Sequence, residues 1–257
     1  MLDAERRQQI VAYVEERNGA TVGELSETFG VSEATARRDL VLLSRQGLIE
    51  RAHGGAVPRQ ARAQRGFPEP PILVRAGLNA AEKRRIGEAA ARFVEDGDTI
   101  IVNGGTTTEH MVPFLGDRQR LTVITNALNV ATLLAAHPHV TVVMLGGVLR
   151  HASFSLLGLL AEDALANLRA DKLFAGIPAL HPDYGLSNDD MTEAQMDRAI
   201  LAAAREVTIL ADHSKFGNVA TVRLAPMSRV KRVVTDGKTP ADHLDALREQ
   251  GILVEVA

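Results

Sequence analysis

Seven short apolar segments, rich in valine and isoleucine, constrain the fold of this chain more than any other feature. They lie at 98–103, 121–125, 140–145, 171–177, 207–211, 232–235 and 252–256. Patterns typical of helices fill most of the intervals between them. Strands that are apolar on both faces and alternate with helices belong to a largely parallel sheet covered on both sides. The sequence therefore predicts an α/β domain, and ligands of such domains bind beyond the carboxyl ends of the strands.

The first 57 residues have a different pattern, that of short helices. Apolar residues at helical spacing predict a first helix over residues 4–17. Thr21 and Glu24 match a capping box, which predicts the start of a second helix, and Ser32 caps a third. This part of the chain is therefore expected to be a small helical unit.

A hairpin and a proline-rich stretch follow these helices. The segments "LIER" and "AVPR" flank "AHGG" and predict two strands around a tight turn. Two capped helices joined by a tight turn and followed by a hairpin form a winged helix-turn-helix. Residues 58–71 contain four prolines and have the composition of a linker. The predicted organisation is a winged helix-turn-helix domain, a linker and an α/β domain, at 1–57, 58–71 and 72–257.

Arginines are concentrated at the N-terminal end of the chain. The whole chain has a formal net charge of −3, but residues 37–65 hold seven arginines, no lysine and two acidic residues. A local basic patch on a helix-turn-helix is the electrostatic signature of DNA binding. In that motif the second helix of the pair enters the major groove. A solvated helix face is the alternative interpretation of Arg37 and Arg38.

The planar guanidinium of arginine binds guanine or phosphate with two parallel hydrogen bonds, so Arg37 and Arg38 are the main candidates. Asp39 is expected to orient a neighbouring arginine, and Arg6 and Arg7 either meet phosphate or have a surface role. The glycines of the wing would let the backbone approach DNA. The predicted DNA-binding residues are Ser32, Glu33, Ala34, Thr35, Arg37, Arg38, Arg51, His53, Gly54 and Gly55.

Polar or glycine-rich segments follow three of the predicted strands, namely "NGGTTTEH" at 103–110, "TN" at 125–126 and "GG" at 146–147. Glycines and backbone amides at such a turn form an anion site. The alternative for the first segment alone is a plain strand-to-helix turn. No lysine stands in the Walker position, so this is not a nucleotide-binding P-loop.

Three residues farther along the chain extend this predicted site. Lys215 lies near a predicted strand end and suits a phosphate. Asp212 is expected to position Lys215 or a backbone turn. Glu193 either binds a sugar hydroxyl or caps its helix behind Thr192, and the sequence leaves both roles open.

The N-terminal domain, with its motifs "VSEATARRDL" and "RAHGGA", resembles that of the DeoR family of bacterial transcriptional regulators. The predicted α/β domain resembles the effector domain of this family. The motifs that carry the resemblance are, in order, "GGTTT", "VITN", "MLGG", "SLLG", "LRADKLF", "YGLS" and "ADHSKFG". The resemblance implies a sensor related to ribose-5-phosphate isomerase, in which a phosphorylated sugar or polyol lowers the affinity for double-stranded operator DNA. It also implies that Gly105, Thr106, Thr107 and Thr108 hold the phosphate and that Thr125, Asn126, Gly146, Gly147 and Lys215 complete the pocket. Gly104 of the glycine-rich turn and Glu193 are added from the motifs themselves, so the predicted effector-binding residues are Gly104, Gly105, Thr106, Thr107, Thr108, Thr125, Asn126, Gly146, Gly147, Glu193 and Lys215.

The chain departs from the family pattern at several positions. Ala36 replaces a larger aliphatic residue, and Asn103 and Gly104 stand where many members have an acidic residue and a serine. Pro178 occupies a position where an aspartate is common, and "AQMDRAI" lacks a lysine often found in that helix. Sugar isomerisation needs positioned carboxylates as acid–base groups, and a proline supplies none. We therefore predict no catalytic residue and no enzymatic activity.

Two alternatives to a regulator remain at this stage. One is a phosphosugar isomerase-like enzyme with an accessory DNA-binding head, and the other is an effector-independent DNA-binding protein. No cofactor or metal is expected, since the histidines lack ligand spacing and the chain has no cysteine. The charged N-terminus and the absence of a long apolar run predict a cytoplasmic protein without membrane contact. Because helix-turn-helix proteins read half-sites in pairs, we expect a homo-oligomer, a dimer or tetramer.

Overall fold

The computed structural model describes residues 3–17, 19–46, 48–52, 54–58 and 72–257. The chain divides into two compact units, Met1–Ala63 and Gln64–Ala257, which are described separately below as the head and the body. The division falls within the stretch predicted as a linker, of which residues 59–71 lie outside the described residues. The exact linker bounds stay a prediction.

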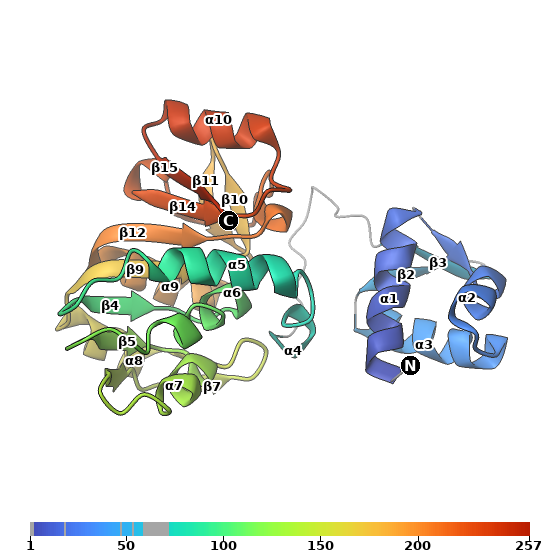
Figure 1. The fold of residues 1–257 in the computed structure, drawn as a ribbon, viewed down its shortest axis with the longest axis horizontal. Coiled ribbons are helices and arrows are strands. Elements are labelled where there is room, and N and C mark those ends of the chain that lie inside the picture. The colour runs from blue at the N-terminus through green and yellow to red at the C-terminus, as the bar shows by residue number, and fades with distance from the viewer. Residues whose placement is uncertain (1–2, 18, 47, 53, 59–71) are drawn as a thin grey trace. The chain divides into compact units, whose positions relative to one another are not determined.

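Within its described residues, the head contains three helices and a small antiparallel sheet with the strand order β1-β3-β2 (Figure 1). This confirms the winged helix-turn-helix, with one short strand, β1, that the sequence analysis did not predict. The elements are α1 (Asp3–Glu16), β1 (Ala20–Thr21), α2 (Val22–Phe29), α3 (Glu33–Arg45), β2 (Ile49–Ala52) and β3 (Gly55–Pro58).

Local signals set the helix ends of the head as the sequence predicts. The Thr21 side chain accepts from the amide of Glu24, whose carboxylate accepts from the amide of Thr21 in return, so the capping box is confirmed. Gly30 ends α2 in the left-handed conformation at φ 61°. The Ser32 hydroxyl accepts from the amide of Thr35, 3.1 Å away, and caps α3. The apolar stripe of α3 is buried, and its members are Ala36, Leu40 and Leu43.

A buried ion cluster joins α1 to α3. Asp39 is 2% exposed and accepts hydrogen bonds from Nε of Arg6 and Nε of Arg7, each at 2.8 Å. Asp39 is expected from the sequence to orient a neighbouring arginine. It orients two, and both come from the first helix. Arg6 is itself buried, which withdraws it from any contact with phosphate.

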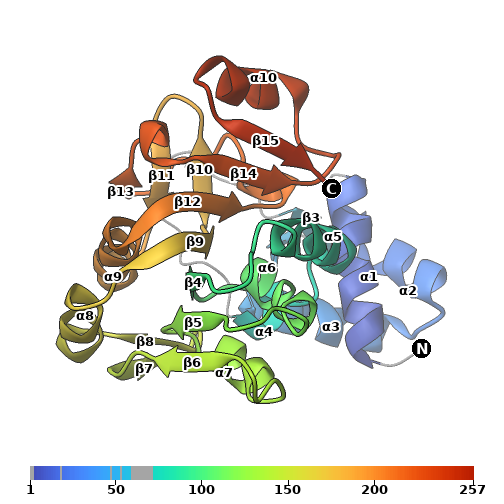
Figure 2. The ribbon, with the colours of Figure 1, turned by 60° about the vertical axis from the view of Figure 1, so that its left-hand side comes forward.

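The body is built on a sheet of seven strands, all paired in parallel, which confirms the predicted α/β class. The strand order is β15-β14-β12-β9-β4-β5-β6, and Figure 2 shows the strands stacked in this sequence. The strands are β4 (Thr99–Val102), β5 (Thr122–Thr125), β6 (Thr141–Met144), β9 (Ala170–Gly176), β12 (Ala204–Leu210), β14 (Arg232–Thr235) and β15 (Leu253–Val256).

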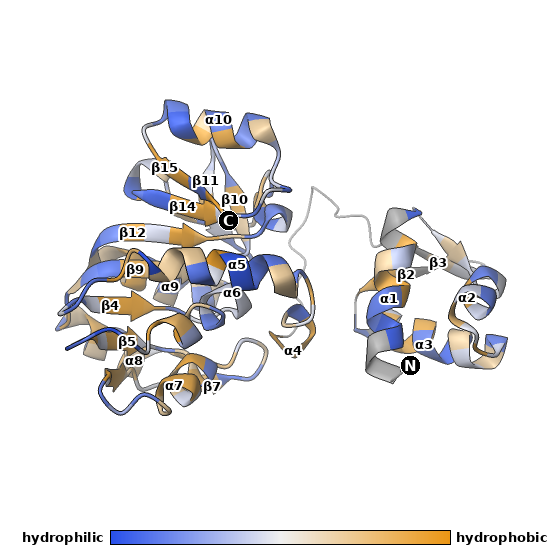
Figure 3. Cartoon of the chain, in the orientation of Figure 1, coloured by the Kyte–Doolittle hydropathy of each residue, from blue (hydrophilic) through white to orange (hydrophobic). Residues whose placement is uncertain are grey.

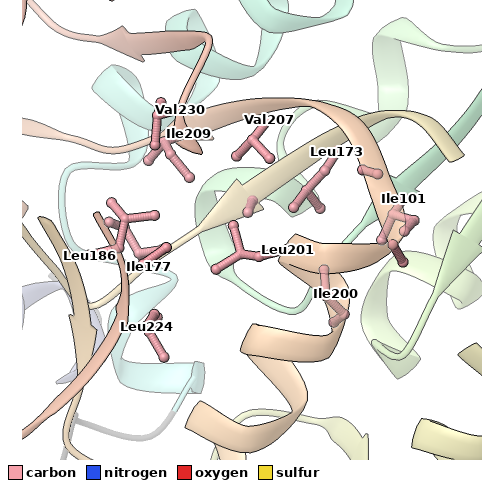
Figure 4. Close-up of a cluster of buried hydrophobic side chains, with 14 of the residues drawn as sticks. Ile101, Leu173, Ile177, Leu186, Ile200, Leu201, Val207, Ile209, Leu224 and Val230 are labelled. Carbon is pink, nitrogen blue, oxygen red and sulfur yellow. The ribbon is translucent and has the colours of Figure 1, made fainter. Parts of the chain in front are cut away.

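Both faces of this sheet are covered, because successive residues of a strand point to opposite sides. On β4, Ile100 belongs to the cluster packed on α5 (Ala80–Ala91) and α7 (Leu128–Leu134), whereas Ile101 belongs to the cluster packed on α8 (Leu159–Ala166) and α9 (Met191–Ala203). Figure 3 shows β4 as largely apolar, and Figure 4 shows Ile101 and Leu173 in the second cluster with Ile200 and Leu201 of α9. The near-continuous apolar strands of the sequence result from this double burial.

Two smaller pieces of sheet, absent from the prediction, extend the body. The strands β10 (Ala179–His181), β11 (Gly185–Asn188) and β13 (Val222–Ala225) form an antiparallel sheet. The strands β7 (Val148–Arg150) and β8 (Ser155–Leu157) form a separate hairpin. The remaining elements are α4 (Ile72–Arg75), α6 (Thr106–Glu109), α10 (Ala241–Glu249) and the 3-10 turns η1 (Val112–Phe114), η2 (His213–Lys215) and η3 (Met227–Arg229). No helix in the described part of the chain is long and apolar enough to cross a bilayer.

Candidate functional site

A cleft opens in the body at the carboxyl edge of the parallel sheet, where β4, β5 and β9 end. It encloses about 590 Å³ of atom-free space, part of which is continuous with solvent. Its lining residues come from strand ends, the β7–β8 hairpin, α4, α9 and η2. They are Arg75, Asn103, Gly104, Gly105, Thr106, Thr107, Asn126, Ser153, Ser155, Leu157, Gly176, Ile177, Pro178, Asn188, Glu193, Asp197 and Lys215.

One wall of the cleft is the glycine- and threonine-rich turn after β4, and Asn103 fixes it to the neighbouring strand. The Asn103 side chain accepts from the amide of Gly176 at 2.9 Å and donates to the carbonyl of the same residue at 3.1 Å. The Thr108 hydroxyl lies 3.0 Å from the carbonyl oxygens of both Asn103 and Gly105. The turn is therefore held in place by its own hydrogen bonds, with Thr106 and Thr107 at the cleft.

Seven of the predicted effector-binding residues lie together in this cleft: Gly104, Gly105, Thr106, Thr107, Asn126, Glu193 and Lys215. The structure does not bring the other four to it. Thr108 is fully buried and bonded within its turn, and the buried Thr125 hydroxyl accepts from the amide of Ala127 at 3.0 Å. Gly147 is pressed against β8, since a Cβ there would lie 2.5 Å from the carbonyl of Leu157, and Gly146 faces Leu160.

A second wall of the cleft is rich in hydrogen-bond acceptors. Asn126 is 4% exposed and donates to the carbonyl of Leu156 at 3.3 Å, while its side-chain oxygen has no partner among the described residues. Glu193 and Asp197 lie one turn apart on α9, and Asp197 accepts from Asn188 at 3.0 Å. A buried acceptor without a donor is costly, so this wall suits a ligand that brings hydroxyl or amine donors.

Arg150 of β7 fixes the carboxylate of Glu193. Its guanidinium lies 3.4 Å from Glu193 and 3.1 Å from Asp190, and it donates to Ser153 at 3.2 Å. Asp190, rather than Thr192, caps α9, because its carboxylate accepts from the amides of Thr192 and Glu193. Glu193 therefore remains at the cleft, which removes the capping alternative considered for it.

Lys215 is held at the cleft by the turn η2. The Asp212 carboxylate caps this turn by accepting from the amide of Ser214 at 3.0 Å, as expected of a turn-forming residue. Burial opposes the ionisation of Asp212, but hydrogen bonds from Ser214 and the charges of Lys215 and Lys83 outweigh it and lower its pKa. Within the described residues, no group of three acidic or histidine side chains is arranged to hold a metal ion.

The predicted DNA-contacting helix presents its N-terminal half to solvent. Ser32, Glu33, Ala34, Arg37 and Arg38 are exposed. Glu33 and Arg37 form an exposed ion pair of 2.6 Å on one helix face, which is weak enough to exchange for a phosphate or base. Thr35 is half-buried, and its hydroxyl lies 2.9 Å from that of Ser32 in the cap. The side chain of Arg51 and the whole of His53 lie outside the described residues.

Gly55 has a packing role that its assignment to DNA contact did not include. A Cβ at this position would lie 2.2 Å from the carbonyl oxygen of Ala20, so β1 and β3 approach each other only because the residue is glycine. Gly54 has a φ of +80° and open space around it. The two glycines are thus required for different reasons, close strand contact and backbone conformation.

We expect Gly55→Ala to lower the free energy of unfolding of the head by about 3 kcal/mol, the upper end of the range for overpacking, because backbone must move. Gly54→Ala costs only left-handed strain of about 1–2 kcal/mol. Urea unfolding of the two full-length variants checks this order. Equal destabilisation by both variants would contradict the close contact between β1 and β3.

The winged head, with its exposed arginine helix, and the anion-suited cleft of the body define a DNA-binding protein with a ligand-binding domain. The family model of the DeoR-like helix-turn-helix domain matches residues 6–61, and that of the DeoR C terminal sensor domain matches residues 78–237. The chain belongs to the DeoR family of transcriptional regulators.

Relatives of similar length support this assignment. The putative aga operon transcriptional repressor of Escherichia coli O157:H7 is 33% identical over 98% of this chain and 93% of its own length. The glycerol-3-phosphate regulon repressor of Escherichia coli K12 is 32% identical over 100% of both chains. These relatives are named as regulators, not as enzymes. Among solved structures, a ribose 5 phosphate isomerase A from Neisseria gonorrhoeae overlaps 53% of each chain with 16% identity and a TM-score of 0.40.

Proposed function

We propose that the protein is a repressor of a sugar or polyol catabolic operon that binds double-stranded operator DNA in the cytoplasm and leaves it when a phosphorylated sugar or polyol binds. One observation carries the proposal: the chain combines a DeoR-type helix-turn-helix domain with a sensor domain whose cleft has two walls of different chemistry, one suited to an anion and one rich in acceptors.

The two walls support the class of effector. Lys215 and the turn at Gly105–Thr107 offer a cation, hydroxyls and backbone amides, which suit a phosphate group. Asn126, Glu193 and Asp197 offer acceptors, which suit hydroxyl groups. A small molecule with a phosphate at one end and hydroxyls along the rest satisfies both walls.

The head supports the DNA part of the proposal. Arg37 and Arg38 are exposed on the helix that enters the major groove in this motif. Paired heads reading two half-sites require at least a homodimer. The effector acts only through a difference in its affinity for the DNA-competent and the released arrangement. An ordinary coupling of about 1–3 kcal/mol corresponds to roughly 5–150-fold in operator affinity.

The test is operator binding followed by fluorescence anisotropy, with DNA from upstream of the protein's own gene. A panel of phosphorylated sugars and polyols is titrated, with the unphosphorylated compounds as controls. We expect one phosphorylated compound to release the DNA and its unphosphorylated counterpart to leave the complex intact. Tight DNA binding that no compound changes would contradict the sensing role and favour effector-independent binding.

We expect Arg38→Ala to weaken operator binding by about 1–3 kcal/mol, which is roughly 5–150-fold. If Arg38 contacts a base, the loss is confined to the operator; if it contacts phosphate, all sequences weaken and the salt dependence becomes shallower. Arg84→Ala, an exposed arginine of the body, is the matched control. Equal affinities of Arg38→Ala and the wild type would remove this face of α3 from the interface.

Two observations speak against the enzyme alternative: the side chain at position 178 of the cleft is a proline, and the relatives are named as transcriptional repressors. A coupled assay with ribose 5-phosphate checks it. We expect no turnover above the rate without protein, and turnover that Lys215→Ala abolishes would overturn the regulator assignment.

A further inference from the structure

The cleft contains a second cation that the sequence analysis did not identify. Arg75 lines it together with Lys215, and it comes from the one-turn helix α4. Its sequence context "ILVR" carries no motif, so only the fold reveals its place. Arginine offers a planar set of donors that matches phosphate oxygens, which lysine does not.

Hydrogen bonds at both ends of helix α4 attach it to the rest of the body. The Ile72 amide donates to the carbonyl of Ala152 at 2.7 Å, in the turn of the β7–β8 hairpin that also carries the cleft residue Ser153. The ammonium of Lys83, which is 3% exposed, donates to the carbonyl of Arg75 at 2.6 Å. Ile72 is buried whereas Leu73 is 75% exposed, so α4 is fixed mainly along one side.

The segments that carry the two cations are also bonded to each other. Asn79, at the start of α5, donates its side-chain amide to Asp212 at 3.1 Å. Asp212 in turn caps the η2 turn that carries Lys215. Arg75 and Lys215, which line the same cleft, are therefore carried by stretches of chain that the Asn79–Asp212 hydrogen bond links to each other.

Helix α4, which carries Arg75, directly follows the stretch of chain that comes from the DNA-binding domain. Residues 59–71 join the head to Ile72, so α4 is the first element of the body after the connection to the DNA-binding domain. A ligand shifts an equilibrium only through contacts that differ between the two states. A bond from the effector to α4 acts in this way when α4 is held more firmly in the released protein than in the DNA-bound protein.

We infer that Arg75 binds the anionic group of the effector together with Lys215, and that this bond fixes α4 and so transmits effector occupancy to the connection with the head. The inference rests on the proposed function, because it assigns a ligand and a transmitting element to the same cleft. Arg75 has two roles in it: it contributes to affinity for the effector, and it couples that binding to DNA release.

The experiment uses the full chain and compares the wild type with Arg75→Gln, Arg75→Lys and the control Arg84→Gln, which removes an exposed arginine of α5. Inorganic phosphate and ribose 5-phosphate serve as probes, and their affinities are measured by calorimetry. Hydrogen exchange at two backbone amides reports how firmly α4 is held. The Ile72 amide bonds to the carbonyl of Ala152, and the Ala76 amide bonds to the carbonyl of Ile72. Operator release by the active compound of the panel is measured in parallel.

We expect both probes to slow exchange of these two amides at least 10-fold in the wild type and in Arg84→Gln. Arg75→Gln should bind both probes at least 10-fold more weakly and, even at saturating probe, should show no slowing at α4. It should lose release of the operator at effector concentrations that release the wild type and Arg84→Gln. Arg75→Lys keeps the charge but not the planar donors, so it should recover part of the affinity.

Two results would overturn the inference while leaving the proposed function intact: Arg75→Gln binds the probes like the wild type, or its α4 amides are slowed equally. Full operator release from Arg75→Gln at saturating effector would overturn the coupling role. If the wild type binds neither probe and no compound of the panel releases DNA, the proposed function fails and the inference fails with it.

Discussion

Replacing Asp39 with alanine is expected to unfold the DNA-binding head while leaving the body folded. The substitution leaves Arg6, itself buried, and Arg7 without their shared carboxylate. Removing one partner of a buried ion pair costs about 3–5 kcal/mol, because the remaining charge is uncompensated. A head of this size buries little surface and has little stability to lose. Operator binding should disappear for all sequences.

The chain offers a selective spectroscopic measurement of this effect. It has no tryptophan and two tyrosines, Tyr13 in the head and Tyr184 in the body. Tyr13 packs edge-on against Phe29 with the ring centroids 5.8 Å apart. In a Tyr184→Phe background, tyrosine fluorescence during urea unfolding therefore reports on the head alone. Glu27→Ala, which removes an exposed acid of α2, is the matched control, and equal midpoints for the two variants would contradict the role of the cluster.

The same cluster makes the head sensitive to acid. Burial opposes the ionisation of Asp39, but the hydrogen bonds and charges of Arg6 and Arg7 outweigh it and hold its pKa below the ordinary value. A lowered carboxyl pKa contributes stability above the unfolded pKa of about 3.9, and this contribution is lost as the pH falls through the folded pKa. The urea midpoint of the wild-type head should fall below about pH 4. The Asp39→Asn head should be less stable than the wild type at pH 7, and its urea midpoint should fall less in acid. Some fall should remain, because the pKa of Glu24 is also lowered in the folded head.

The second large effect is expected from Lys215→Ala, which should strongly reduce release of the operator at effector concentrations that just saturate the wild type. Hydrogen bonds to charged groups contribute about 1.5–3 kcal/mol, so effector affinity should fall roughly 10–150-fold. The lysine lies on a turn capped by Asp212, and the hydrogen bonds of this cap go to the amide and the hydroxyl of Ser214. DNA affinity without effector should therefore be unchanged.

Lys231→Ala is the matched control, because Lys231 is exposed and lies at the amino end of β14, at the opposite edge of the sheet. Titration of wild type and both variants with the active compound separates loss of affinity from loss of folding, which a thermal unfolding scan monitors. Wild-type release by Lys215→Ala would remove this lysine from the effector site and leave the turn at Gly105–Thr107 as the phosphate-binding wall.

The main sheet and the head could be predicted from the sequence because their signals are local. Val, Ile and Leu runs define the strands, and Thr21, Glu24 and Ser32 define helix starts whatever surrounds them. The small strands β7, β8, β10, β11 and β13 are about as short as most strands of the main sheet, but they lack its runs of valine and isoleucine. Their existence depends on pairing partners, which a sequence does not display.

The candidate site was predictable as a set of strand ends but not as a set of side chains. Thr106, Thr107 and Thr108 are equivalent in sequence, yet only the last turns its hydroxyl back to the carbonyls of Asn103 and Gly105. Arg75 reaches the cleft through tertiary packing of a single helical turn. The partnership of Arg6 with Asp39 spans 33 residues, and no local pattern indicates it.

The hydrogen bonds that Asn103 and Thr108 make to their own surroundings have a consequence for the speed of regulation. They order the turn that we propose as the phosphate site without a ligand, so capture of an effector there does not wait for a loop to fold and little ordering entropy is lost on binding. Metabolite binding should then be fast, and the delay between arrival of the sugar phosphate and the start of transcription should be set by departure of the protein from its operator.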